Sequence, residues 1–132
     1  SAINRHGELA ERVNTTSATK RSLVCECEEV SVGEVEYALN ELDVHNLVDL
    51  RRRTRVGMGT CQGELCACRA AGLMSEAGKY CTREAKQDLT DFLNERWKGM
   101  APVAWGDTLR ESQFTTWLYD GVCGLKNQKN TI

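Results

Sequence analysis

Cys25-Glu26-Cys27 and, after thirty-three intervening residues, Cys61-Gln62-Gly63-Glu64-Leu65-Cys66 are the stretches that decide how this chain folds. Each stretch holds two cysteines at a short spacing, and a further thiol follows at Cys68. Thiolate sulfur binds zinc, copper(I) and iron–sulfur clusters in preference to hard cations. The spacing therefore predicts a soft-metal site whose two halves meet only when the chain folds.

The composition is that of an ordinary globular domain with its own core: 132 residues, 41% hydrophobic and 27% charged. A formal net charge of −2 gives no general reason to bind nucleic acid or membrane surfaces. No apolar run approaches the roughly 20 residues of a membrane span. Seven cysteines are an odd number, and in a reducing compartment clustered cysteines are more often metal ligands or catalytic thiols than disulfides. We expect a cytoplasmic protein.

Helix signals dominate the sequence between the two thiol pairs and directly after them. Ser31 and Glu34 form a capping-box pattern that predicts a helix to about residue 41. Asn46 is a second candidate N-cap, for a short helix that ends before Gly57. A third helix is predicted from about residue 64 to 76, with Gly78 as its stop.

Two further helices are predicted toward the C-terminus. Thr82 is the expected N-cap of the first, and Gly99 is its expected stop. The second begins at Asp107 or Thr108. Its predicted inward-facing residues are Leu109, Phe114, Trp117, Leu118 and Val122. Because no stretch alternates apolar and polar residues, the predicted fold class is mainly α.

The sequence divides into four expected regions. Residues 1–21 are polar without a convincing apolar stripe, which predicts a linker or arm that continues an upstream domain. Residues 22–80 contain both thiol pairs and form the predicted metal-binding region. Residues 81–125 form a helical extension, and residues 126–132 a polar tail.

A [2Fe-2S] cluster fits the cysteine spacing better than zinc does. Both pairs are predicted beside helix N-termini, whose amide groups stabilise anionic centres. Zinc knuckles usually space paired ligands by two to four residues. Cys-x-Cys is shorter and the step from Cys61 to Cys66 is longer, and two metals tolerate such unequal spacings more easily than one tetrahedral ion. Zinc and free or disulfide-bonded cysteines remain as alternatives.

Longer motifs add a resemblance to a known family. Cys25-Glu26-Cys27, the following helix and Gly59-Thr60-Cys61-Gln62-Gly63-Glu64-Leu65-Cys66 resemble the bacterioferritin-associated-ferredoxin-like (BFD-like) [2Fe-2S] domain, which is small and helical. The stretches 49–63 and 92–99 extend the resemblance to the C-terminal domain of the FAD-containing large subunit in the anaerobic glycerol-3-phosphate dehydrogenase family.

The resemblance implies that Cys25, Cys27, Cys61 and Cys66 hold the cluster, although four residues separate the second pair here and two separate it in the free-standing ferredoxin. It implies an upstream FAD domain that oxidises glycerol 3-phosphate to dihydroxyacetone phosphate. Electrons would pass through the cluster to partner subunits and the quinone pool, at the cytoplasmic face of the inner membrane. Exposed clusters are lost in air, so a sample can contain an empty or zinc-filled site.

The remaining signals indicate no independent catalysis. Cys68, Cys81 and Cys123 are expected to be buried packing residues. The basic run at residues 51–55 is expected to be a solvated helix end, with neutralisation of the cluster's charge or docking of an acidic partner as the alternative, ahead of nucleic acid. Two other functions stay open: a structural docking module with an empty or zinc-filled site, and a redox sensor that uses Cys66 and Cys68.

Overall fold

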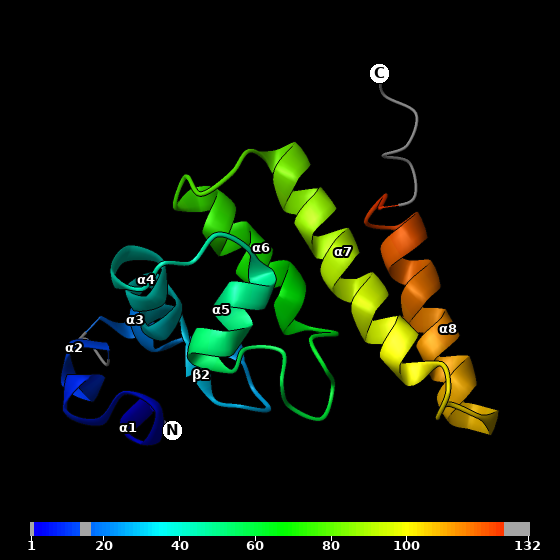
Figure 1. Ribbon diagram of the computed structural model, residues 1–132, viewed down its shortest axis with the longest axis horizontal. Coiled ribbons are helices and arrows are strands. Elements are labelled where there is room, and N and C mark those ends of the chain that lie inside the picture. The colour runs from blue at the N-terminus through cyan, green and yellow to red at the C-terminus, as the bar shows by residue number, and fades with distance from the viewer. Residues whose placement is uncertain (1, 14–16, 126–132) are drawn as a thin grey trace.

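Helices make up most of the chain in the computed structural model, which describes residues 2–13 and 17–125 (Figure 1). The elements in order are α1 (Ala2–His6), the 3-10 helix η1 (Gly7–Leu9), α2 (Ala10–Val13), α3 (Ala18–Arg21), β1 (Leu23–Cys25), β2 (Val30–Ser31), α4 (Val32–Glu41), α5 (Leu47–Thr54), α6 (Cys66–Glu76), α7 (Thr82–Met100) and α8 (Gly106–Gly121). The predicted mainly helical fold is confirmed. The expected tail, 126–132, lies outside the described residues.

One apolar core joins α4, α5, α6 and α7. The predicted capping box is present: the Glu34 N–H donates to the Ser31 hydroxyl at 3.2 Å, and the Ser31 N–H donates to the Glu34 carboxylate at 3.1 Å. Asn46 caps α5 as predicted, because its side chain accepts a bond from the Asp49 N–H at 2.9 Å. The buried side chains on these four helices include Val35, Ala38, Leu39, Leu47, Leu50, Ala67, Ala70, Met74, Leu89, Phe92 and Leu93.

The first 21 residues pack more closely than the sequence predicts. Ala2 and Val13 are buried, and the Arg5 guanidinium donates to both carboxylate oxygens of Glu34 at 2.7 and 2.8 Å. This ion pair joins α1 to the start of α4. The expectation of an unpacked arm is wrong for its described part. The few apolar residues are distributed over several short helices, so no single helical period reveals them.

A two-stranded antiparallel hairpin precedes α4 and was not expected from the sequence. Leu23 lies opposite Ser31, and Cys25 lies opposite Val30, with an irregularity between these two pairs. Strands of three and two residues are too short to show a period of two. The hairpin matters for function because its turn carries Cys27.

The boundaries of α7 differ slightly from the prediction. Cys81, not Thr82, is the N-cap, and its N–H donates to the Glu84 carboxylate at 2.8 Å. The helix continues through Gly99 to Met100. Within the described residues, none of the helices has the length and apolar character that crossing a bilayer requires.

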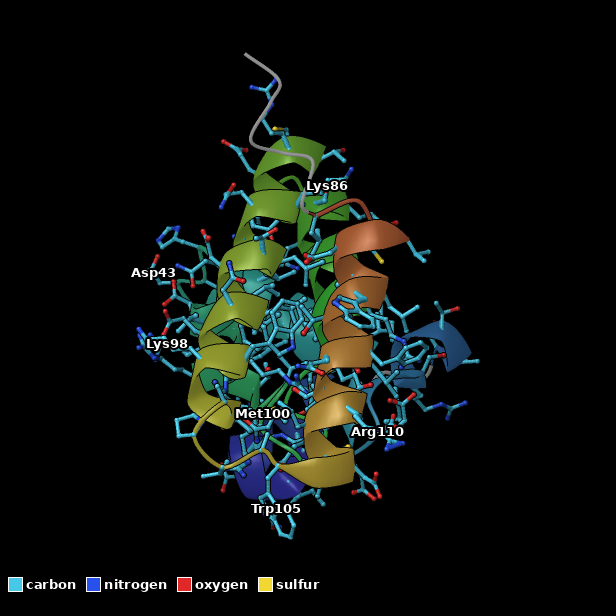
Figure 2. All side chains as sticks on the ribbon, turned by 90° about the vertical axis from the view of Figure 1, so that its right-hand side faces the viewer. Asp43, Lys86, Lys98, Met100, Trp105 and Arg110 are labelled. Carbon is cyan, nitrogen blue, oxygen red and sulfur yellow. The ribbon has the colours of Figure 1, made fainter. Side chains whose placement is uncertain are left out.

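The predicted inward face of α8 is wrong. Phe114, Trp117, Leu118 and Val122, which we call the outer face of α8, are exposed, and so is Leu109 at 38%. Thr115 and Tyr119 are buried instead. The helix lies beside α7 at the edge of the molecule (Figure 1), and Trp105 points away from the body just before it begins (Figure 2). Helical period shows that apolar residues share a face, but it does not show whether that face meets the core.

Candidate metal centre

The β1–β2 hairpin positions the first thiol pair. Cys25 ends β1 and is buried, whereas Cys27 lies in the turn and is exposed. The turn closes with a bond from the Glu29 N–H to the Glu26 carbonyl at 3.3 Å, and Glu29 takes a positive φ of 50°. The pair is therefore held by a hairpin, with β2 between it and α4, and not directly by a helix N-terminus as predicted.

The loop between α5 and α6 positions the second pair. Cys66 is buried and is the first residue of α6, at a helix N-terminus as the sequence predicts. Cys61 lies in the loop before it, which turns at Gly63 with a φ of 89°. A Cβ atom on Gly59 would stand 2.2 Å from the Cys27 Cβ. Only glycine at that position lets the loop lie directly against the hairpin.

The fold brings all four predicted thiols together, as two neighbouring pairs. The Cys27 Sγ and Cys61 Sγ lie 3.7 Å apart. The Cys25 and Cys66 thiols hydrogen-bond to each other, and Cys61 is close enough to Cys66 to act on it electrostatically. Among the described residues, no three His, Cys, Asp or Glu side chains converge as a site for a single metal ion.

The two pairs differ in their electrostatic surroundings. Burial, together with the neighbouring Cys25 thiol, raises the pKa of Cys66 to about 12. Hydrogen bonds from the Thr60 hydroxyl and the Cys61 backbone N–H lower the pKa of Cys27. In the metal-free chain the exposed Cys27 therefore forms a thiolate more readily than the buried Cys66.

The donor set fits an iron–sulfur cluster. Two thiolates on one tetrahedral metal with bonds of about 2.3 Å lie about 3.8 Å apart, which is close to the Cys27–Cys61 separation. Four thiols are the usual ligands of a [2Fe-2S] cluster, and peptide N–H groups that donate to the sulfurs tune its potential. Such bonds are present here, from the Gly57 backbone to Cys66 and from the Cys61 backbone to Cys27.

Exposed ion pairs surround the hairpin turn. The Arg69 guanidinium on α6 bonds to the Glu26 carboxylate at 2.6 Å. Arg55, from the basic run, donates to the Glu28 carboxylate at 2.8 Å. Pairs as exposed as these contribute little stability, and each arginine charge is balanced by its carboxylate. The basic run is thus partly a solvated helix end, as expected, and partly a contact with the metal-binding hairpin.

Several residues around the site could not be found from the sequence, and all come from α7 and α8. The Arg96 side chain donates twice to the Cys61 carbonyl, at 3.2 Å from Nε and 3.0 Å from Nη2. The Thr115 hydroxyl donates to the Glu64 carboxylate at 2.9 Å, and the Tyr119 hydroxyl donates to the Glu64 carbonyl. These contacts join residues 35 to 55 positions apart, and no local motif marks them.

The other three cysteines are exposed. The prediction that Cys68, Cys81 and Cys123 are buried packing residues is therefore wrong. Partial burial of the Cys68 thiol and the nearby Cys123 thiol raise the pKa of Cys68. Cys68 thus faces the end of α8, and its electrostatic neighbour is not one of the four thiols at the site.

A scan of protein families matches residues 23–76 to the BFD-like [2Fe-2S] binding domain. This segment begins at the hairpin and ends with α6, so it contains both thiol pairs. The family match stops before α7. No solved structure gives a significant match to the chain.

Curated relatives extend the similarity to the whole chain, and each is one subunit of an anaerobic glycerol-3-phosphate dehydrogenase. The Escherichia coli relative is 57% identical over 133 aligned residues, which cover all of this chain and 24% of that protein. The Haemophilus influenzae relative is 56% identical over 98% of this chain and 23% of its own length. The Haloferax volcanii relative is 34% identical over 84% of this chain and 18% of its own. The chain thus spans about a quarter of the length of its first relatives.

Proposed function

This chain carries a BFD-like [2Fe-2S] binding domain and is homologous to the C-terminal part of a subunit of anaerobic glycerol-3-phosphate dehydrogenase, and we propose that it is the electron-transfer module of such a dehydrogenase. Cys25, Cys27, Cys61 and Cys66 hold a [2Fe-2S] cluster. The observation that carries the proposal is the meeting of two thiol pairs distant in sequence, with 3.7 Å between the Cys27 and Cys61 sulfurs.

The bound cluster would supply a one-electron centre. The protein contributes the four thiols, the amide and hydroxyl groups that favour their ionised forms, and a wall that separates part of the site from water. Cys25 and Cys66 are buried on the core side, whereas Cys27 is exposed. The exposed side gives a short path for an electron to or from a redox partner.

The role in a complete dehydrogenase follows from the relatives. In a protein of their length, a flavin in the remaining part would oxidise glycerol 3-phosphate to dihydroxyacetone phosphate. A flavin can release two electrons, and a one-electron centre beside it passes them on singly to other subunits and then to the quinone pool. Residues 22–80 would form the cluster-binding unit, and 81–125 the extension that supports it. We place the protein in the cytoplasm, at the inner membrane through its complex.

A second candidate function is a docking module with an empty or zinc-filled site. The outer face of α8 favours it, because Phe114, Trp117 and Val122 are large apolar residues with exposures of 55%, 66% and 82%. We take the occupant of this face to be the rest of the dehydrogenase polypeptide, since the relatives are about four times as long as this chain and a neighbouring part of one polypeptide meets it at high effective concentration. The two functions are compatible.

Anaerobic purification followed by visible spectroscopy and analysis of iron and acid-labile sulfide tests the electron-transfer proposal. We expect two irons and two sulfides per chain, and replacement of any of the four ligands by serine should reduce both. C68S and C123S are matched controls that should keep the cluster. Colourless protein with stoichiometric zinc after anaerobic reconstitution would leave only the docking function.

The docking function has its own test in a full-length dehydrogenase polypeptide. Trp117→Ser should leave the metal content unchanged and increase the susceptibility of the segment that joins this region to the rest of the polypeptide to limited proteolysis. If the cleavage rate stays the same and only the association with other subunits weakens, the occupant is a different polypeptide of the complex.

A further inference from the structure

Arg96 is the buried positive charge nearest to the thiol loop. Its side chain is 7% exposed, and its two bonds to the Cys61 carbonyl, at 3.0 and 3.2 Å, hold a backbone group of a proposed ligand. The residue belongs to α7, beyond the segment that matches the cluster-binding family. The extension therefore contacts the site directly.

The other arginines close to the site are arranged differently. Arg69 and Arg55 are about half exposed and each has a carboxylate partner within 2.8 Å. Arg96 has only a longer contact, 3.7 Å from its Nη2 to the Glu64 carboxylate, and its buried Nη1 has no hydrogen-bond partner. Because water screens exposed pairs, Arg96 is the charge whose field is least reduced at the thiols.

The surroundings of Glu64 prevent it from neutralising Arg96 more closely. The Thr115 hydroxyl bonds to the Glu64 carboxylate at 2.9 Å, and the Tyr119 hydroxyl bonds to its carbonyl. Both donors lie on α8, which thus holds Glu64 from one side. Arg96 is left to bond the Cys61 carbonyl. Helices α7 and α8 together support the loop that carries Cys61 and Cys66.

We propose that Arg96 is a positioning residue for the cluster, which fixes the Cys61 segment through its carbonyl and supplies a buried positive charge that stabilises the reduced state. Reduction adds one negative charge to the cluster, so a nearby unscreened cation raises the reduction potential. The part about the potential rests on the proposed cluster. The part about the loop does not, because the bonds to the Cys61 carbonyl involve the protein alone.

The test compares R96Q and R96K with two controls. R69Q removes an exposed, paired arginine next to the hairpin. R110Q removes an arginine that lies on the outside of the molecule (Figure 2) and pairs with Asp107 with both side chains largely exposed. Circular dichroism checks that each variant is folded, and redox titration followed by electron paramagnetic resonance gives the potential.

For R96Q we expect a reduction equilibrium about tenfold less favourable, which is about 59 mV for one electron. R96K keeps the charge but not the two-pronged bond, so its potential should fall less than that of R96Q. R69Q and R110Q should stay close to the wild-type value. An unchanged potential in R96Q, or an equal fall in R69Q, overturns the electrostatic role.

A second measurement uses the reduced, metal-free chain, so its outcome does not depend on the cluster. Loss of the charge-assisted bonds to Cys61 should make amide hydrogen exchange in residues 57–66 about tenfold faster in R96Q than in R110Q. Equal exchange rates would refute the positioning role. If the wild-type chain binds no cluster but R96Q still loosens the loop, the proposed function fails and the positioning role stands.

Discussion

Replacement of Gly59 by alanine should disrupt the metal centre without touching any thiol. The new Cβ would stand 2.2 Å from the Cys27 Cβ, whereas ordinary contact begins at 3.4 Å. The loop and the hairpin must separate by about 1.2 Å to remove the clash. Forcing an extra methyl group into a packed contact costs about 1–3 kcal/mol. Because the clash falls on a proposed ligand, much of this cost should appear as a wider Cys27–Cys61 spacing and weaker metal binding.

The expected loss is about tenfold or more in metal affinity, since 1.4 kcal/mol is one decade. Iron and sulfide per chain, the visible spectrum and the unfolding midpoint of the metal-free chain are the measurements. Gly72 on α6 is a matched control, because a Cβ there meets no heavy atom within 4 Å. G72A should bind the cluster normally and be unchanged or stabilised by about 0.5–1 kcal/mol. If G59A retains the wild-type iron content, spectrum and midpoint, the close contact between loop and hairpin is not what forms the site.

Three further predictions follow from buried groups near the site. Phe92→Ala removes a buried ring that lies against the glycines of the thiol loop and should lower the free energy of unfolding by about 3–5 kcal/mol in a denaturant titration; a loss below 1 kcal/mol would contradict this packing. Burial alone would raise the pKa of Glu34, but bonds from Arg5 and the Ser31 backbone lower it below 4.5. Its ionised form therefore stabilises the fold above about pH 4.5, and that contribution is lost as the pH falls through the lowered value. R5Q should destabilise the chain and shift acid unfolding to higher pH, whereas equal acid midpoints would exclude this linkage. In the metal-free, reduced chain iodoacetamide should modify Cys27 before Cys66, because hydrogen bonds lower the pKa of Cys27 whereas burial raises that of Cys66 to about 12; mass spectrometry after tryptic digestion gives the order, and faster labelling of Cys66 would refute it.

Local patterns predicted the helices of the cluster-binding region well. The Ser31 and Asn46 caps are made by bonds between residues three positions apart, so a short motif contains all the information needed. The ends of α7 moved by one residue or so, because caps compete over neighbouring positions. The arm and the hairpin were missed for the opposite reason, since their segments are too short to show a period and become ordered by packing on α4.

The sequence by itself determined which thiols could form a metal centre. The cysteine spacings and the motifs around them identify the four proposed ligands, and the fold brings these four together. Only the tertiary structure decided what surrounds them. The bonds from Arg96 to the Cys61 carbonyl and from α8 to Glu64 join residues more than 30 positions apart. The exposure of the outer face of α8 likewise depends on which side of that helix meets α7. Ligand chemistry is a property of individual residues and their spacing, whereas support and burial arise from contacts that form only when distant helices pack.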